Sequence, residues 1–554
     1  MRNADSINKP LATLLMSLGL IAAGCGEAEV VSFEAPTGAV GSKGSKSDSS
    51  ADAVFLDFEW DGELIANSCF NPNSTIESQV LWTVGQLNGN NSVGRTDRLE
   101  ITNIETGSDS DGGCRVTYHA KMPVAWGELH NVPTSYTLTL PLDMRTSGVD
   151  RFVEQYNPQC SDFGAHDVTA GIMWYYFRPA RSGCTLADED LATMEATVFD
   201  SPIGTTGKYP EYHEIWKDDV FEIVAIFGKY KDDATTSSDA GIGAWNQFVR
   251  DVQQFMGPMG LTMEPANIPH NAGVENPEIS FEASLPDGKR IVMRAFLVDS
   301  VGSADSTFWA KYEALTPSAD FIVYNGHAGL GSNIRKLASK GVWKTGQYAI
   351  VFMNGCDTYA YVDSALADAH AAVNDDDDEG TKYLDIVANA MPSFFRSMPA
   401  ATMALVRALT DFENPRTYEQ ILDKIDAHEV ALVSGEHDNV YFPGFGDDTT
   451  PEPPAEDWKG FDEQGTVAKD EAMHFASPVL PAGRYEVALD GTGDADLYVR
   501  IGEAPGTELF DCRPFDAGSA EICSVDLQSD APIHVMVVGW AASSDFKLTG
   551  TRLQ

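Results

Sequence analysis

Three patterns of apolar and polar positions follow one another along the chain. Residues 54–204 alternate short apolar and polar runs with turn signals, as in VFLDFEWDG and CRVTYHAKM, which is typical of strands with one buried face. In residues 205–445, continuous apolar strands alternate with helical stretches, and this pattern indicates a mostly parallel sheet covered on both faces. Residues 465–554 return to short alternating strands. We therefore expect an N-terminal all-β domain, a central α/β domain and a C-terminal β-sandwich.

The apolar spacing also places individual elements. In the first domain, Asp109 to Gly113 reads as a hairpin turn between two strands. The central domain is expected to hold strands at 221–230, 320–324 and 348–353, a hairpin at 279–298, and helices at 242–256, 307–315, 363–373, 400–409 and 418–428. Residues 446–464 are acidic and rich in proline, so we expect a stiff linker before the last domain.

The N-terminus predicts export. Residues 11–24 form an apolar run of 14 residues after Arg2 and Lys9, which is too short for an ordinary membrane-spanning helix and is typical of a secretory signal. The stretch that ends at Cys25 resembles a bacterial lipoprotein signal, which implies that Cys25 is acylated and anchors the chain in a bacterial membrane. Ordinary secretion is the alternative. Residues 26–53 are rich in Gly, Ser and Lys towards their end and predict a flexible tether.

The strongly negative net charge argues against a nucleic-acid partner. The 554 residues include 37 Lys and Arg against 83 Asp and Glu, a formal net charge of −46. Nucleic-acid binding needs a basic surface that replaces counterions on phosphate, so we expect no nucleic-acid partner. Apolar residues make up 43% of the chain and aromatic residues 10%, which is too much for a disordered acidic polymer. The surplus of carboxylates leaves calcium open as a structural ion.

Eight cysteines suggest a disulfide scheme, because structural cysteines of exported proteins occur in pairs. Cys25 is set aside by the signal. Cys512 and Cys523 can pair locally in the last domain, and four cysteines of the first domain can form two bridges with three possible connectivities: Cys69, Cys114, Cys160 and Cys184. Cys356 is then left as a free thiol.

Two predicted strands of the central domain each run into a reactive residue. FIVYNG leads to His327 and YAIVFMNG leads to Cys356. Functional side chains of open parallel sheets lie at the carboxyl ends of the strands, so we expect both residues at one edge of the sheet. An imidazole beside a thiol favours the thiolate and can protonate a leaving amine, which is the apparatus for attack on a carbonyl.

Residues 215–445 resemble the caspase-like cysteine peptidases, and the gingipain-like members in particular. That family also places His before Cys, each after an apolar strand; the spacing here is 29 residues. The resemblance implies His327 as general acid and base and Cys356 as nucleophile. It also implies a role in the oxyanion turn for three glycines, Gly326, Gly329 and Gly355.

The C-terminal segment resembles the bacterial pre-peptidase C-terminal domain. The resemblance is carried by residues 490–499 (DGTGDADLYV), 511–514 (DCRP) and 521–523 (EIC). It implies a β-sandwich that aids secretion or substrate binding and often binds calcium. Asp494 and Asp496 are the candidate calcium ligands, with a plain acidic turn as the alternative.

These observations lead to one hypothesis and one alternative. The first is a secreted or surface-anchored cysteine endopeptidase that cleaves proteins or peptides through His327 and Cys356 and needs no cofactor for catalysis. The alternative is a non-catalytic adhesin or binding lipoprotein with a lapsed peptidase-like domain. Zinc is not expected, because the sequence holds neither Cys-x-x-Cys nor His-Glu-x-x-His.

Overall fold

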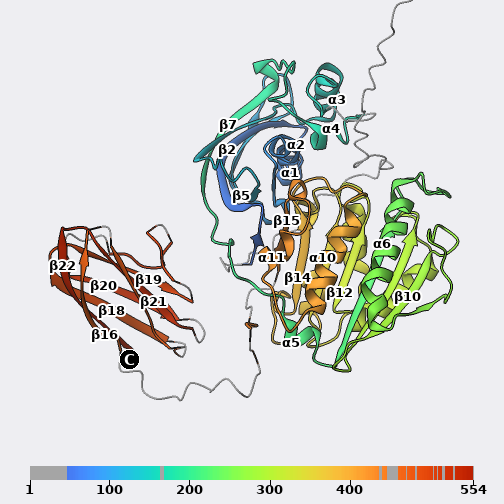
Figure 1. Cartoon of the computed structure of the whole chain (residues 1–554). Coiled ribbons are helices and arrows are strands. Elements are labelled where there is room, and N and C mark those ends of the chain that lie inside the picture. The colour runs from blue at the N-terminus through green and yellow to red at the C-terminus, as the bar shows by residue number, and fades with distance from the viewer. Residues whose placement is uncertain are drawn as a thin grey trace, which may run out of the picture. The chain divides into compact units, whose positions relative to one another are not determined.

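The computed structural model describes residues 47–162, 168–435, 440–443, 445, 460–469, 471–478, 480, 483–502, 504–507, 509–514, 518–527 and 531–552. Cys25, the expected lipidation site, lies outside the described residues, as does most of the expected linker. The chain divides into two compact units, residues 1–445 and 446–554. Figure 1 shows the elements of both.

A nine-stranded mixed sheet is the centre of the first unit, in the order β1-β15-β14-β13-β12-β8-β11-β10-β9. The five strands from β14 to β11 are parallel, and antiparallel strands extend the sheet at both edges. The strands are β1 (Ser49–Ser50), β8 (Val220–Gly228), β9 (Thr262–Glu264), β10 (Glu278–Ser284), β11 (Arg290–Val298), β12 (Phe321–Asn325), β13 (Ala349–Asn354), β14 (Leu384–Asn389) and β15 (Ala431–Ser434).

Helices cover both faces of this sheet, because alternate strand residues are apolar on either side. The apolar side chains of α6 and α10 pack on one face, and those of α7 and α8 pack on the other. The helices of this part are α5 (Tyr212–Ile215), α6 (Ala240–Met256), α7 (Ser306–Leu315), α8 (Ser332–Lys340), α9 (Ala365–Ala371), α10 (Met398–Thr410) and α11 (Tyr418–Leu422).

The N-terminal region contains helices as well as strands, so the expectation of an all-β domain is wrong. Its six-stranded antiparallel sheet consists of β2 (Val54–Ala66), β3 (Ser92–Gly94), β4 (Glu100–Ser108), β5 (Cys114–Trp126), β6 (Ser135–Pro141) and β7 (Leu191–Asp200). Its helices are α1 (Asn73–Val80), α2 (Trp82–Asn88), α3 (Thr146–Tyr156) and α4 (Met173–Tyr176). Ile76, Val80, Val84 and Leu87 are buried at helical spacing, a signal that the alternating strands on either side obscured.

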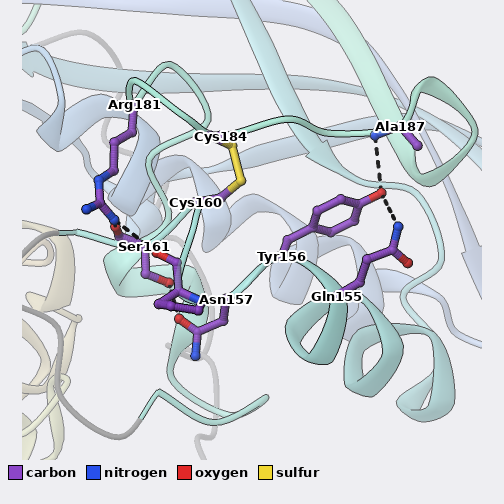
Figure 2. Close-up of a disulfide and its surroundings, with 9 residues drawn as sticks. Gln155, Tyr156, Asn157, Cys160, Ser161, Arg181, Cys184 and Ala187 are labelled. Carbon is purple, nitrogen blue, oxygen red and sulfur yellow. Dashed lines mark hydrogen bonds between the residues drawn. A yellow bond between two sulfur atoms is a disulfide. The ribbon is translucent and has the colours of Figure 1, made fainter.

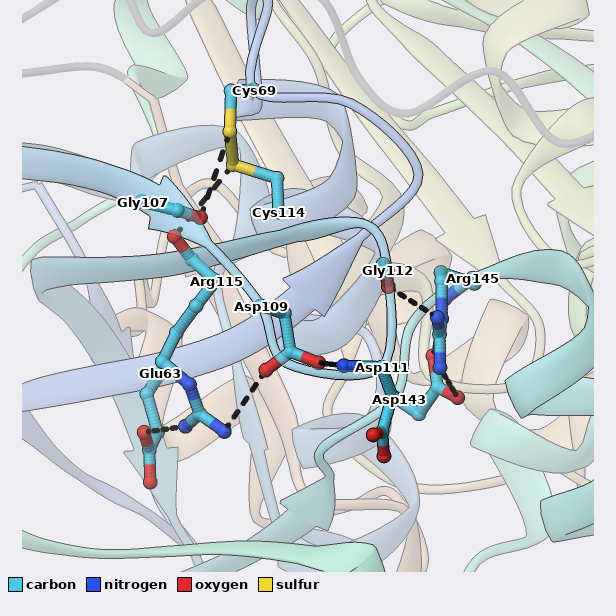
Figure 3. A network of polar contacts seen from close by, with 10 residues as sticks. All are labelled: Glu63, Cys69, Gly107, Asp109, Asp111, Gly112, Cys114, Arg115, Asp143 and Arg145. Atoms are coloured by element: carbon cyan, nitrogen blue, oxygen red, sulfur yellow. Dashed lines mark hydrogen bonds and ion pairs between the residues drawn. A yellow bond between two sulfur atoms is a disulfide. The ribbon is translucent and has the colours of Figure 1, made fainter.

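The acidic turn between β4 and β5 is held by two arginines (Figure 3). Asp109 accepts a hydrogen bond from the backbone N–H of Asp111 at 3.1 Å and pairs with Arg115 at 3.4 Å. Gly112 and Gly113 have φ angles of 82° and 105°, which favour glycine. The Gly112 carbonyl accepts a hydrogen bond from Arg145 at 2.6 Å. The hairpin therefore closes where the sequence places it.

Residues 47–53 pack into the fold, which corrects the expectation that the whole stretch 26–53 is a tether. β1 pairs antiparallel with β15, and Asp48 is fully buried. The Asp48 carboxylate accepts a hydrogen bond from Tyr359 at 2.6 Å and lies 3.7 Å from the Arg95 guanidinium. Burial alone would raise the pKa of Asp48, but Arg98 and Arg95 outweigh it and hold the pKa below its usual range. This segment thus joins the N-terminal region to the central sheet.

Three disulfides occur among the described residues, and they settle a connectivity that spacing left open. Cys69 bonds to Cys114, Cys160 to Cys184 and Cys512 to Cys523. Figure 2 shows Cys160–Cys184 with Arg181, whose guanidinium donates to the carbonyl of Ser161. Disulfides of this kind persist in oxidising compartments, so the chain is an exported protein.

The second unit consists of two antiparallel sheets around a core of its own. One has the order β16-β22-β18-β20 and the other β17-β21-β19. Val487, Leu497, Val537 and Leu548 are fully or almost fully buried between them. The strands are β16 (Asp462–Ala468), β17 (Ala472–Ala476), β18 (Gly483–Thr492), β19 (Ala495–Ile501), β20 (Glu521–Leu527), β21 (Ile533–Gly539) and β22 (Ser543–Arg552). The first strand begins inside the segment expected to be linker.

None of the helices in the described part of the chain combines the length and apolar character that crossing a bilayer requires.

Buried His370 on α9 makes the first unit sensitive to acid. Its ring packs on Trp343, with the two ring centroids 4.5 Å apart. Neither ring nitrogen of His370 has a hydrogen-bond partner among the described residues. Burial lowers the pKa of His370 to about 4. Since the unfolded chain binds this proton near pH 6.5, stability is lost as the pH falls from 6.5 to 4, by on the order of 3 kcal/mol. Urea unfolding of His370→Phe should lack this loss, whereas exposed His130→Phe should retain it. Equal pH dependence in all three proteins would refute the assignment.

Candidate functional site

The carboxyl edge of the parallel strands holds the residues that the sequence singled out. Asn325 and Asn354 are paired at the ends of β12 and β13, so the two chain segments leave the sheet side by side. The N–H of Gly326 donates to the Asn354 carbonyl at 3.2 Å. A Cβ atom on Gly355 would lie only 2.8 Å from the Gly326 carbonyl oxygen, so this approach requires glycine. His327 and Cys356 follow directly after these glycines.

His327 is held by contacts on the same edge. Its Nε2 lies 3.0 Å from the carbonyl oxygen of Tyr230, which can only accept, so Nε2 carries the proton of this hydrogen bond. The ring also packs against Tyr230 and Phe395, with centroids 5.3 and 5.2 Å away. The aromatic pair and the carbonyl together fix the orientation of the imidazole.

Cys356 is disulfide-bonded and buried, so the expectation of a free thiol is wrong. No free cysteine occurs among the described residues, and the sulfur that bonds to Cys356 lies outside them. The expectation followed from setting Cys25 aside and pairing the other cysteines within each domain, which left Cys356 as the odd one. A cysteine in a disulfide supplies no thiolate, which is the nucleophilic form.

The glycine-bearing turn after β12 is shaped by its own side-chain contacts. Gly329 has a φ angle of 60°, a conformation in which glycine is favoured. The carbonyl of His327 accepts hydrogen bonds from Tyr324 at 2.9 Å and from the Asn333 amide at 2.9 Å. The turn therefore packs tightly onto the start of α8.

A buried carboxylate next to Cys356 was missed by the sequence analysis. Asp357 accepts a hydrogen bond from the Asn88 amide at 2.7 Å and from the Tyr175 hydroxyl at 2.5 Å. Both donors come from the N-terminal region. Burial raises the pKa of Asp357 to about 6, although the two hydrogen bonds act in the opposite direction. Its partners are so distant in sequence that no local pattern could have revealed them.

Asparagines line the ends of three adjacent strands beneath this edge. Asn325, Asn354 and Asn389 end β12, β13 and β14, and all three are fully buried. The Asn354 amide donates to Asn325 at 2.8 Å and accepts from Ser393 at 2.7 Å. Ser393 belongs to the loop that carries Phe395 to the His327 ring. Hydrogen bonds of this polar network thus hold the loop with Ser393 and Phe395 against the ends of the strands.

The expected calcium ligands have other partners. Asp494 accepts a hydrogen bond from the Gly518 N–H at 2.9 Å, and Asp496 forms an ion pair with Arg513 at 2.6 Å. Within the part of the chain that the structure describes, no group of three His, Cys, Asp or Glu side chains could hold a metal ion.

Comparison with known proteins places short parts of the chain beside peptidases. No family model matches. The chain is 49% identical over 51 residues to a neutral protease of Vibrio proteolyticus, which is 9% of this chain and 8% of that protein. It is 47% identical over 75 residues to a zinc metalloprotease of Helicobacter pylori, 13% and 29% of the two chains. It is 35% identical over 98 residues to alkaline serine exoprotease A of Vibrio alginolyticus, 17% and 18%.

The chain therefore spans less than a third of each of these curated relatives. A solved structure titled "Solution structure of vEP C-ter 100" is 31% identical, covers 17% of this chain and 92% of its own, and has a TM-score of 0.15.

These relatives correct the hypothesis drawn from the sequence. One of them is named a zinc metalloprotease, so the resemblance to caspase-like and gingipain-like cysteine peptidases is not upheld. The His327–Cys356 endopeptidase is overturned with it, in keeping with the disulfide at Cys356. The expectation that catalysis needs no cofactor is likewise contradicted by the zinc enzyme.

The residues of this chain nevertheless do not fit a catalytic zinc. The sequence holds no His-Glu-x-x-His, and the described residues offer no cluster of three suitable ligands. A catalytic zinc needs about three protein ligands. The described residues therefore do not form a catalytic zinc site.

The disulfide at Cys356 is open to direct mapping. Native protein treated with iodoacetamide, then digested without reduction, should yield Cys356 only in a cross-linked peptide. Cys512 and Cys523, joined in the structure, serve as the internal control. An alkylated Cys356 in the native protein would contradict the assignment.

Asp357 should stabilise the contact between the N-terminal region and the central sheet. Asp357→Ala leaves two buried donors without an acceptor and places alanine at a φ of 51°, so we expect a loss of about 2–4 kcal/mol. Asp357→Asn keeps one acceptor and tolerates this backbone conformation, so its loss should be smaller. Urea unfolding of both variants measures the difference. Equal stability of Asp357→Ala and the wild type would show that the contact contributes nothing.

Proposed function

We propose that this chain is an exported hydrolase of proteins or peptides and that its C-terminal unit, residues 446–554, holds the polypeptide. The observation that carries this proposal is the match to peptidases at 35 to 49% identity. The disulfides agree with a chain that works outside the cytoplasm.

The chemistry of the relatives supports a binding role for the shared segment. One relative is named a zinc metalloprotease and another a serine exoprotease. We take one segment of this chain to account for both matches. A zinc-bound water and a serine hydroxyl require different catalytic residues, so such a segment does not carry the catalytic step. What both enzymes share is a polypeptide substrate.

The length of the matches supports its location. The matched segments of 51 to 98 residues fit within the C-terminal unit, which has its own core and its own disulfide, and we propose that they lie there. The first unit, with its much larger sheet, is then the part that acts on a polypeptide once the second unit has bound it.

Reduced and carbamidomethylated α-lactalbumin, which stays unfolded, tests this proposal. Purified full-length protein should bind it and convert it to smaller peptides, whereas folded α-lactalbumin should be bound less because its backbone is already paired. Parallel reactions with 1,10-phenanthroline and with phenylmethylsulfonyl fluoride assign the catalytic class. A protein that neither binds nor cleaves the unfolded substrate would refute the proposed function.

A further inference from the structure

We propose that strand β17, Ala472–Ala476, is a docking edge to which an extended segment of a polypeptide substrate adds as a further strand. This inference rests on the proposed function, since it names the surface of the C-terminal unit that holds the polypeptide. Strand addition of this kind recognises the main chain of a ligand through hydrogen bonds.

The register shows which backbone groups of β17 face outwards. The strand ends its three-stranded sheet and pairs with β21. The Gly539 N–H donates to the Glu471 carbonyl at 3.0 Å, and the Ser477 N–H donates to the Ile533 carbonyl at 2.9 Å. Since antiparallel residues alternate between facing their partner and facing away, the odd-numbered residues of β17 bond to β21.

The even-numbered residues therefore offer their backbone to a ligand. Ala472, His474 and Ala476 direct three N–H and three C=O groups away from β21. Among the described residues, no strand pairs with this side of β17. A row of unpaired donors and acceptors at the spacing of a strand is a template for another strand.

The exposure of the side chains on β17 agrees with an edge that no other strand covers. Met473 and Phe475 point to the core of the unit, yet both are only partly buried. Core-facing side chains of an internal strand are normally covered from both sides, as Val535 and Val537 of β21 are. The side chains of Ala472, His474 and Ala476 are exposed, and two of them are too small to obstruct an incoming strand.

The other edge strands of the unit are less open to pairing with a ligand strand. The edge of β19 is occupied, because the N–H of Cys512 donates to the Val499 carbonyl at 3.1 Å. β16 carries exposed Glu463, and β20 carries exposed Asp526. Charged residues at an edge oppose pairing with another strand. β17, with the sequence AMHFA, has no Asp, Glu, Lys, Arg, Pro or Gly.

A foreign polypeptide is a better occupant than a second copy of the chain. The formal net charge of −46 makes two copies repel each other. Main-chain hydrogen bonding is nearly independent of the sequence of the ligand, which suits a protein that acts on varied substrates. It also agrees with the proposal that enzymes of different catalytic chemistry match the C-terminal unit.

A proline in β17 tests the docking edge in the full-length protein. His474→Pro removes one outward N–H without removing a bond to β21, a position at which edge strands tolerate proline. The matched control His474→Thr also removes the imidazole but keeps the N–H. Fluorescence anisotropy with labelled, carbamidomethylated α-lactalbumin at 4 °C should show roughly tenfold weaker binding for His474→Pro. Binding by His474→Thr should stay within about twofold of the wild type.

Each other outcome has a defined meaning. Wild-type affinity in His474→Pro, or equal weakening in both variants, would overturn the docking edge while leaving the proposed function intact. A wild-type protein that does not bind the substrate would overturn both. Dimers in sedimentation that His474→Pro abolishes would identify a second copy as the occupant and overturn the inference. If His474→Pro does not fold, Ala476→Pro and Ala476→Thr form an equivalent pair.

Discussion

The first unit depends on a buried ion pair that joins three parts of the chain. Asp48 comes from the N-terminal segment, Arg95 from the N-terminal region and Tyr359 from the central domain, and all three are at least 95% buried. Each charged or polar group would cost several kcal/mol without its partners, so the three parts have to assemble together. Asp357 with Asn88 and Tyr175 repeats this arrangement nearby. The regions that the sequence separates at residue 204 consequently form one compact unit.

The packing of the N-terminal region against the central sheet also shapes the sheet edge that bears His327 and Cys356. The N-terminal region supplies the donors that surround Asp357, and the asparagines at the strand ends fix the loop that bears Phe395. Hydrogen bonds between side chains therefore hold this edge in place. We propose that polypeptide binding occurs instead in the second unit, where β17 leaves backbone groups open. Separate units for binding and for the central sheet agree with relatives of several catalytic types that match only a short segment.

The sequence predicted what depends on local periodicity. Apolar runs located β8, β12 and β13 within about two residues, and helical spacing located α6 and α7. The Asp109–Gly113 turn followed from its glycines. Long-range contacts were not accessible in this way: the hydrogen bond of Asn88 to Asp357 joins residues 269 positions apart in sequence. The bonded state of the Cys356 sulfur has no local signature either. The His327–Cys356 hypothesis failed for this reason. The order of the strands predicts that both residues lie at one edge of the sheet, but it does not predict that the Cys356 sulfur is in a disulfide.

The central claim is that a polypeptide pairs with the outward backbone of β17. Hydrogen–deuterium exchange of the full-length protein, with and without unfolded α-lactalbumin, tests it at the level of single peptides. The account predicts that bound substrate slows exchange in a peptide spanning residues 471–477, through the amides of Ala472, His474 and Ala476, while β20 peptides are unchanged. Saturating substrate that leaves exchange in residues 471–477 unaltered would contradict the claim.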